Sequence, residues 1–188
     1  MTRKEQKEER RQAILMTALT LFVERGYHDT KIADIAAAVP MSQGLLFHYF
    51  ASKEELLNEL VKLGTMGPGM VGADVNIPPD MYLTGLLAKI FSFAGEQPWV
   101  FYMFVLMAQV RRPGMPEEAR KIAESADAIT PTVKLIKQGQ KAGVFHKGDA
   151  ETMAVCFWAS VQGIMEEISR NKDMKLPDPE WIVSMLRA

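Results

Sequence analysis

The segment 30–56 constrains the fold of this chain more than any other stretch. Its sequence, TKIADIAAAVPMSQGLLFHYFASKEEL, predicts two short helices joined by a tight turn, with a third helix directly behind them. Val39 precedes Pro40, a pair that disfavours continuing the first helix, and Ser42 is a good cap for the second. The box SKEE at 52–55 then opens the third helix. This order is typical of a helix-turn-helix unit.

The segments on both sides also have helical periodicity. Apolar residues within 14–22 recur on one face of a helix that we expect over about 4–25, with Gly26 as its stop. After a break at 64–72, helices are predicted over about 80–95, 98–110, 116–143 (which Pro131 either splits or kinks), 149–171 and from 178 onwards. No strand-like alternation stands out. We therefore expect an all-α fold, with a three-helix helix-turn-helix domain and its linking helix over 1–63 and a larger helical domain over 64–188.

Composition indicates a soluble, cytoplasmic protein. Cys156 is the only cysteine, so a disulfide framework within the chain is excluded. The longest apolar run, 99–108, is too short to span a membrane, and the charged N-terminus lacks a signal-peptide pattern. The net charge is -1, and residues 1–62 contain nine Lys or Arg and nine Asp or Glu. Any attraction to phosphates must therefore depend on where single cations are placed.

Polar side chains at the start of the second short helix suit a nucleic-acid contact. This helix begins Ser42-Gln43-Gly44 and carries His48 and Tyr49 towards its end. Such side chains, at the exposed start of a helix set across another helix, can read base edges in the major groove of DNA. A short surface helix of a helical bundle is the alternative, and the spacing of the whole pattern favours DNA reading.

A spaced pattern of apolar, glycine and polar residues runs through the first 60 or so positions. It comprises Ile14-Leu15, Ala18, Leu21-Phe22, Gly26-Tyr27, Thr30, Ile35-Ala36, Ser42-Gln43-Gly44, His48-Tyr49-Phe50 and Ser52-Lys53-Glu54. In this pattern the N-terminal third of the chain resembles the N-terminal domain of the TetR family of transcriptional regulators. Beyond it, only the helical layout and the segment 139–145 are similar to the family.

The resemblance implies a homodimeric regulator, usually a repressor, in which each subunit lays its second short helix in a major groove of a palindromic operator. It also implies that the domain over 64–188 binds a small ligand and that this ligand releases the DNA. Carried over by position, the residues expected at the DNA are Thr30, Ser42, Gln43, Gly44, Leu45, His48, Tyr49 and Lys53. Thr30, which we also expect to cap a helix, and Lys53 would meet phosphates at helix N-termini, while Gln43 would reach base edges.

Three positions depart from the family pattern. Pro40 stands where the family usually has glycine, so we expect a turn without a positive φ. Leu45 replaces a small polar residue, and our hypothesis is that it packs on a thymine methyl group. Phe47 replaces a tyrosine that often supplies a phosphate-binding hydroxyl. With the balanced charge, Pro40 and Leu45 keep an alternative open: a dimeric ligand- or partner-binding helical module whose DNA binding has degenerated.

The predicted helix over 149–171 is apolar around most of its circumference, so it must be buried on more than one side. Its small residues would let a second helix come close. Together with the C-terminal helix it predicts a four-helix bundle across a two-fold axis. The expected dimer interface comprises Val155, Ala159, Gly163, Trp181 and Met185. The alternative is a central helix of a monomeric core.

Thirteen methionines and several aromatic residues suggest an apolar ligand pocket in the C-terminal part. Ordinary core packing is the alternative for each of these residues. A pocket between 98–110, the region of Thr130 and 149–171 would be mostly apolar with a few polar groups, which suits a small lipophilic ligand. Its expected lining comprises Tyr102, Met103, Met107, Trp158 and Gln162.

The remaining features predict no further chemistry. The cations Arg3, Lys4, Lys7, Arg10 and Arg11 alternate with three glutamates, a mixture typical of a solvated helix face. His28 and His146 are isolated, no cluster has metal-ligand spacing, and we expect neither a metal nor a cofactor. No glycine-rich phosphate loop, nucleophile motif or facing carboxylate pair supports an enzyme. The expected partners are double-stranded DNA, a small lipophilic ligand and a second copy of the chain, but no membrane.

Overall fold

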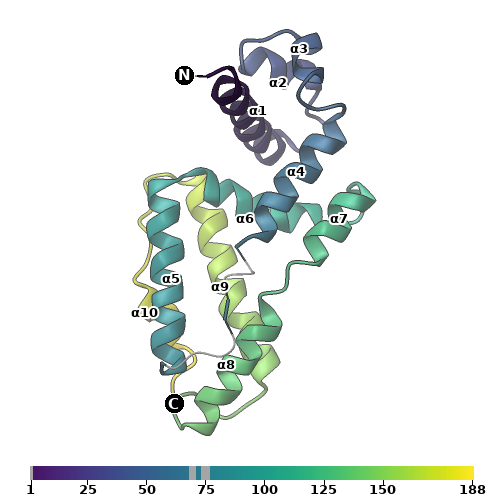
Figure 1. The fold of residues 1–188 in the computed structure, drawn as a ribbon. Helices are drawn as coiled ribbons and strands as arrows, with labels where there is room; N and C mark the ends of the chain where they lie inside the picture. The colour runs from purple at the N-terminus through teal and green to yellow at the C-terminus, as the bar shows by residue number, and fades with distance from the viewer. Residues whose placement is uncertain (1, 68–70, 73–76) are drawn as a thin grey trace. The chain divides into compact units, whose positions relative to one another are not determined.

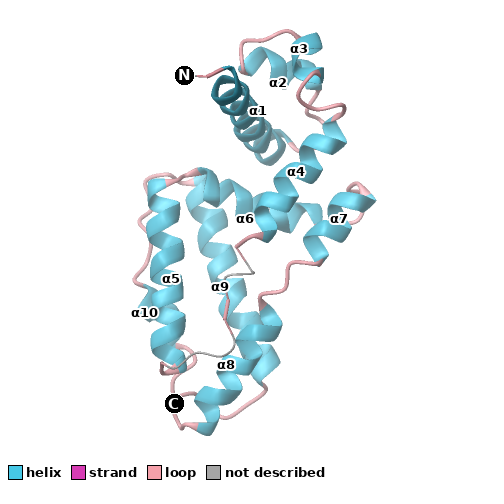
Figure 2. Cartoon of the chain, viewed as in Figure 1, coloured by secondary structure: helices cyan, strands magenta, loops and turns pink. Residues whose placement is uncertain are grey.

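The computed structural model describes residues 2–67, 71–72 and 77–188, and its regular elements are helices (Figure 1). They are α1 (Arg3–Arg25), α2 (Ile32–Ala38), α3 (Gln43–Phe47), α4 (Lys53–Thr65), α5 (Pro79–Glu96), α6 (Trp99–Val110), α7 (Glu117–Glu124), α8 (Ile129–Lys141), α9 (Ala150–Arg170) and α10 (Pro179–Ser184). Figure 2 shows these helices joined by loops, with no strand in the described part. The predicted all-α fold is confirmed, and among the described residues no helix is long and apolar enough to cross a membrane.

Helix ends follow the capping residues of the sequence. The side chain of Asp149 accepts the N–H of Thr152 (2.7 Å) and starts α9, while that of Asp178 accepts the N–H of Glu180 (2.9 Å) and starts α10. The long helix expected over 116–143 is split into α7 and α8, with Pro131 in the first turn of α8. Part of the predicted break at 64–72, residues 68–70, lies outside the described residues.

The chain forms two compact units. Unit 1 comprises Met1–Thr65 and Val105–Glu124, and unit 2 comprises Met66–Phe104 and Ser125–Ala188. The first segment of unit 1 ends close to the boundary expected after residue 63, but the sequence did not assign its second segment to it. This segment joins unit 1 because α7 packs on α4, and two alanines of α7, Ala119 and Ala123, are fully buried.

The core of unit 1 is built on the apolar stripe of α1, and the short helices α2 and α3 add buried side chains to it. Its fully buried members include Ile14, Ala18, Leu19, Phe22, Ile35, Leu46, Leu56, Leu57, Leu60 and Val61. Arg11 closes the edge of this core, because its guanidinium donates to Glu59 (2.5 Å) and lies 5.1 Å from the centre of the Phe50 ring. The Lys62 ammonium and Arg11 lower the pKa of the Glu59 carboxyl, so this carboxylate is ionised at neutral pH.

The core of unit 2 lies between α5, α8, α9 and α10. Its fully buried members include Leu83, Leu87, Leu135, Ile136, Phe157, Val161, Met165 and Val183. Gly139 on α8 permits one close approach within it, because a Cβ at this position would lie 2.1 Å from the ring of Phe145. The N–H groups of Val144 and Phe145 both donate to the Gly139 carbonyl, which turns the chain directly back onto α8.

The turn between α2 and α3 has an unusual backbone. The N–H of Met41 donates to the carbonyl of Ala36 (2.9 Å), which is the long hydrogen bond of a Schellman helix end. Pro40 lies between the C-cap residue of α2, Val39, and the donor residue Met41, and its φ is +21°. The expectation that this turn would avoid positive φ is therefore wrong, because closing the Schellman bond requires it. Proline fits poorly here, since its ring favours φ near about −65° and it has no N–H for the second bond of the motif.

Replacing Pro40 by glycine should stabilise the protein by about 1 kcal/mol. Relief of backbone strain is worth roughly 1–3 kcal/mol, and the greater freedom of glycine in the unfolded chain offsets about 1 kcal/mol of it. Urea unfolding of Pro40→Gly measures the change. The matched control is Pro113→Gly, at an exposed proline without positive φ, which should only lose stability. Equal losses in the two variants would contradict the strain argument.

Gly139→Ala should destabilise the protein by roughly 1–3 kcal/mol, because the new methyl group overlaps the Phe145 ring in a packed core. Thermal or urea unfolding measures the loss. Gly85→Ala on α5 is the control, since no atom lies within 4 Å of its added Cβ and a helical alanine is favoured over glycine. A Gly139→Ala protein as stable as Gly85→Ala would refute the close approach.

Candidate nucleic-acid interface

One side of α3 anchors the helix and the other side is open to solvent. Leu46 is fully buried and Phe50, just after the helix, is 1% exposed. Ser42 caps the start, where its hydroxyl oxygen accepts the N–H of Leu45 (3.2 Å). Gln43, Gly44, Phe47 and His48 are exposed on the remaining surface of the helix and its C-cap. A short helix held in this way presents polar and apolar side chains outward on a fixed base.

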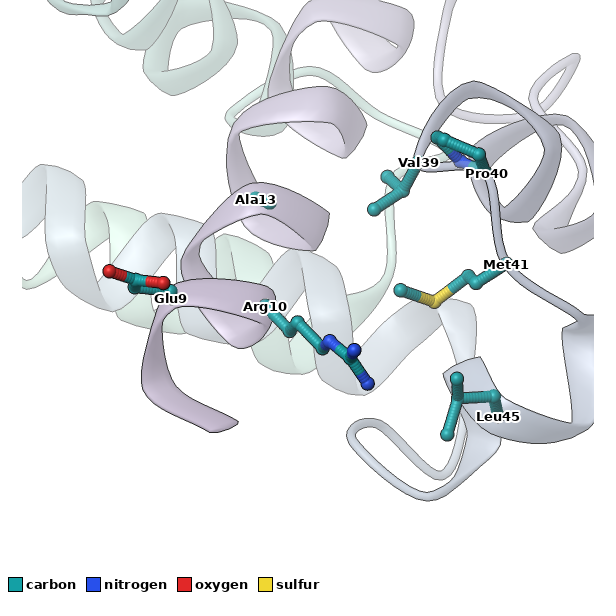
Figure 3. Close-up of a pocket in the computed structure, with 7 residues that line it drawn as sticks. All are labelled: Glu9, Arg10, Ala13, Val39, Pro40, Met41 and Leu45. Atoms are coloured by element: carbon teal, nitrogen blue, oxygen red, sulfur yellow. The ribbon is translucent and has the colours of Figure 1, made fainter. Parts of the chain in front are cut away.

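Leu45 lies beside an open, mostly apolar hollow of about 410 Å³ (Figure 3). The lining comprises Glu9, Arg10, Ala13, Val39, Pro40, Met41 and Leu45. Figure 3 shows Arg10 extending from α1 toward Met41 and Leu45, whereas Glu9 lies on the other side of the helix in this view. Half-buried Leu45 therefore borders both the exposed face of α3 and this apolar hollow.

A second hollow, of about 230 Å³, has a different lining. It is formed by Arg3, Gln6, Lys7 and Arg10 of α1 and by Tyr49, which follows α3. Three of these five side chains are cationic and none is acidic. The sequence interpretation of a solvated face did not foresee this cluster, although the spacing of the cations at i, i+4 and i+7 was a usable signal.

The prediction for Thr30 needs correction. Its side chain is fully buried, and its hydroxyl donates to the carbonyls of Gly26 (2.8 Å) and Leu21 (3.2 Å) at the end of α1. The cap of α2 is Lys31, not Thr30. The hydroxyl is committed to backbone groups that the end of α1 presents, so it does not reach a surface where a phosphate could bind.

Lys53 also has an internal role rather than the expected surface role. Its ammonium donates to the carbonyls of Tyr27 (2.7 Å) and Thr30 (2.9 Å) and lies 4.3 Å from the centre of the Tyr27 ring. Desolvation lowers the pKa of Lys53, and Asp29 nearby opposes that shift. Lys53 therefore joins the start of α4 to the loop between α1 and α2, and its prediction as a phosphate ligand is not supported by its geometry.

The structure thus brings six of the eight predicted DNA residues together on and beside α3: Ser42, Gln43, Gly44, Leu45, His48 and Tyr49. The side chains of Thr30 and Lys53 do not belong to this group, because they donate to backbone carbonyls instead. Phe47 joins the set, because 48% of it is exposed beside Gly44 and His48. In the sequence, Phe47 stood out only as a departure from the family pattern.

The five residues expected in a dimer interface are all exposed. Val155, Ala159 and Gly163 are spaced four residues apart along α9. Trp181 of α10 and its C-cap residue, Met185, have the same spacing. The exposed fractions are 50% for Val155, 70% for Trp181 and 50% for Met185. The opposite side of α9 faces the core of unit 2. α9 is thus apolar on two sides, of which this subunit covers one.

The residues expected to bind a ligand have mixed surroundings. Trp158 donates its indole N–H to the hydroxyl of buried Thr132 (2.9 Å), and the amide of Gln162 donates to the carbonyl of Phe104 (3.2 Å). Tyr102 is half-buried, while Met103 and Met107 are buried, with Met107 in unit 1 and the other four residues in unit 2. None of the five lines either hollow described above.

Metal ligation has no basis in the described residues, among which no three His, Cys, Asp or Glu side chains are grouped to hold an ion. The polar groups that remain accessible around α3 are an amide, an imidazole, a phenol and hydroxyls. These are hydrogen-bonding groups suited to recognition of a surface, and the helix that carries them has the width that the major groove of DNA admits.

Comparison with known proteins adds to this geometry. Residues 14–60 match the family of bacterial regulatory proteins called the tetR family. The HTH-type transcriptional repressor KstR2 of Mycobacterium tuberculosis is 43% identical over 53 residues, which are 28% of this chain and 26% of that protein. The match thus spans about a quarter of the length of this relative.

Solved structures extend the likeness to nearly the whole chain. The MbdR regulator from Azoarcus sp. CIB superposes with a TM-score of 0.78 at 23% identity, over 94% of this chain and 96% of its own. AibR, solved in complex with isovaleryl coenzyme A and operator DNA, has a TM-score of 0.73 at 22% identity, over 95% and 98%. At these identities the likeness shows the fold alone. The segment 14–60 thus matches the tetR family of bacterial regulatory proteins, and the chain shares the fold of these solved structures.

Proposed function

We propose that this protein is a ligand-responsive transcriptional regulator, acting as a repressor, that binds a palindromic operator as a homodimer. The observation that carries the proposal is the exposed side of α3, held outward by Leu46 and Phe50 within the segment 14–60. The function is binding rather than catalysis. A DNA partner also implies a cytoplasmic location.

The exposed side of α3 supplies the groups for reading bases. The Gln43 amide can donate and accept, which matches the N6 and N7 edge of adenine. Gly44 is exposed and has no side chain, so α3 can approach the base edges closely there. Leu45 offers methyl groups beside the same surface, which suits contact with a thymine methyl group. His48 and Tyr49 would contact the backbone or bases at the end of the helix.

A second copy of the chain is the proposed partner of the exposed α9 and α10 face. A two-fold axis would place this face against itself, which buries Trp181, Met185 and Val155 together. Ala159 and Gly163 leave room for two α9 helices to approach. In the dimer the two copies of α3 would meet successive major grooves, about 34–36 Å apart.

A small lipophilic ligand is the proposed signal, with Tyr102, Met103, Met107, Trp158 and Gln162 as its candidate contacts. Support comes from the fold shared with AibR, which was solved with an acyl coenzyme A and operator DNA. Such a ligand changes DNA affinity only by its different affinity for the DNA-bound and DNA-free arrangements of the protein. The sign of that difference, release of the operator, defines the repressor proposed here.

A second candidate is a dimeric ligand- or partner-binding module with degenerate DNA binding. The internal hydrogen bonds of Thr30 and Lys53 favour it, because two expected phosphate contacts are occupied. The strained turn at Pro40 also favours it, since this turn positions α3. Measured binding to DNA separates the two candidates.

Gln43→Ala should weaken binding to the operator by about fivefold to 150-fold, because one bidentate base contact is worth roughly 1–3 kcal/mol. Binding to a shuffled duplex of the same composition should stay unchanged. Fluorescence anisotropy with the DNA upstream of the protein's own gene, and with its shuffled version, measures both affinities. Gln12→Ala, at an exposed glutamine that lines neither hollow, is the control. A wild-type protein that binds neither duplex at low salt would establish the degenerate module instead.

Sedimentation should find the wild-type protein dimeric at micromolar concentration, and Met185→Glu should raise the dimer dissociation constant at least about tenfold, because a buried unpaired carboxylate is costly. Met81→Glu provides the matched control, since Met81 is also exposed in unit 2 but lies on α5. It should leave the dimer intact. A wild-type protein that sediments only as a monomer would reject this interface.

A further inference from the structure

The first three turns of α1 carry a cationic surface that the function proposed above does not yet use. Resting on that proposed function, we propose that Arg3, Lys7 and Arg10, together with Gln6 and Tyr49, bind the sugar–phosphate backbone of the duplex whose bases α3 reads. These five residues, which surround the second hollow, are called the α1 cradle below. The partner is the phosphodiester backbone of double-stranded DNA.

Helical spacing separates the charges of this segment into two sides. At about 100° per residue, Arg3, Lys7 and Arg10 fall within about 60° of one another around α1. Each neighbouring glutamate, at positions 5, 8 and 9, is at least about 100° from the nearest of these cations. The apparent mixture of charges in the sequence is therefore a cationic side and an acidic side in the helix.

The three cations are available for a ligand. All three are exposed, and within the described part of the chain none has a carboxylate at ion-pair distance. The neighbouring Arg11 differs, because Glu59 and the Phe50 ring hold its guanidinium. The Glu5 carboxylate accepts the N–H of Thr2 at the start of the helix and is also occupied. The cradle therefore keeps an uncompensated positive charge.

The position of Tyr49 connects the cradle to the base-reading surface. Tyr49 follows the C-cap of α3, His48, and lines the hollow together with four residues of α1. A duplex that receives the exposed side of α3 in its groove presents phosphates along the edges of that groove. Guanidinium, ammonium, amide and phenol groups are all donors to phosphate oxygens.

This arrangement also explains how a chain with balanced charge can bind DNA. A protein with net charge -1 has no general attraction to a polyanion, so its affinity must come from cations gathered at the contact. Thr30 and Lys53 do not supply them, for the reasons given above. The α1 cradle supplies three, within the same compact unit as α3.

The test is the salt dependence of DNA binding by the full-length protein. The variant Arg3→Gln/Lys7→Gln/Arg10→Gln should reduce the slope of log affinity against log salt by about 2.7 per bound subunit, at about 0.9 for each phosphate that the variant leaves unneutralised. The ratio of wild-type to variant affinity should then fall about 40-fold between about 50 and 200 mM NaCl. Both the upstream duplex and its shuffled version should show this effect, because phosphate contacts carry no sequence information.

The matched control is Lys134→Gln/Lys137→Gln/Lys141→Gln, which removes the same charge from exposed positions of α8 in unit 2 and should keep the wild-type slope. Arg3→Lys/Arg10→Lys should also keep it, which separates charge from folding. If the wild-type protein binds DNA and the cradle variant has its slope, or if the slope of the α8 variant falls as far, this inference is overturned while the regulator remains. If the wild-type protein binds neither duplex, the proposed function fails and the inference fails with it.

Discussion

Burial of Leu46 and Phe50 is the interaction on which the exposed side of α3 depends. A helix as short as α3, Gln43–Phe47, has no stability of its own in water, because nucleation costs more than its few hydrogen bonds return. Its conformation therefore comes from these two side chains and from the Ser42 cap. The Phe50 ring in turn lies under Arg11, whose ion pair with Glu59 joins α1 to α4. The exposed polar groups are ordered because apolar groups behind them are buried.

Hydrogen bonding within the loop at 26–31 explains why a motif residue need not be a contact residue. Loops place backbone carbonyls close to the protein interior, and each one needs a donor. Thr30 and Lys53 donate to five carbonyls in or next to this loop, at Leu21, Gly26, Tyr27, His28 and Thr30. A side-chain donor in such a motif can therefore serve either a ligand or the chain itself. Only coordinates distinguish the two uses.

The sequence predicted the elements well and the long-range packing poorly. Periodicity and capping residues located α1, α4, α9 and α10 within a few residues, because these signals act over single helical turns. The packing of α7 on α4 joins residues more than 50 positions apart, and no local pattern encodes it. The positive φ of Pro40 was missed for a similar reason. The hydrogen bond between Met41 and Ala36 sets that angle against the preference of the residue itself.

The contact between Gly139 and the Phe145 ring has a consequence for how this protein can change over generations. The Phe145 ring occupies the space that a side chain at position 139 would need. Neither position can therefore vary alone without a cost in stability. A larger residue at 139 becomes tolerable once the aromatic ring at 145 has given way to a smaller side chain. Evolutionary drift at this place in α8 must therefore proceed by paired exchange, in which Phe145 shrinks first.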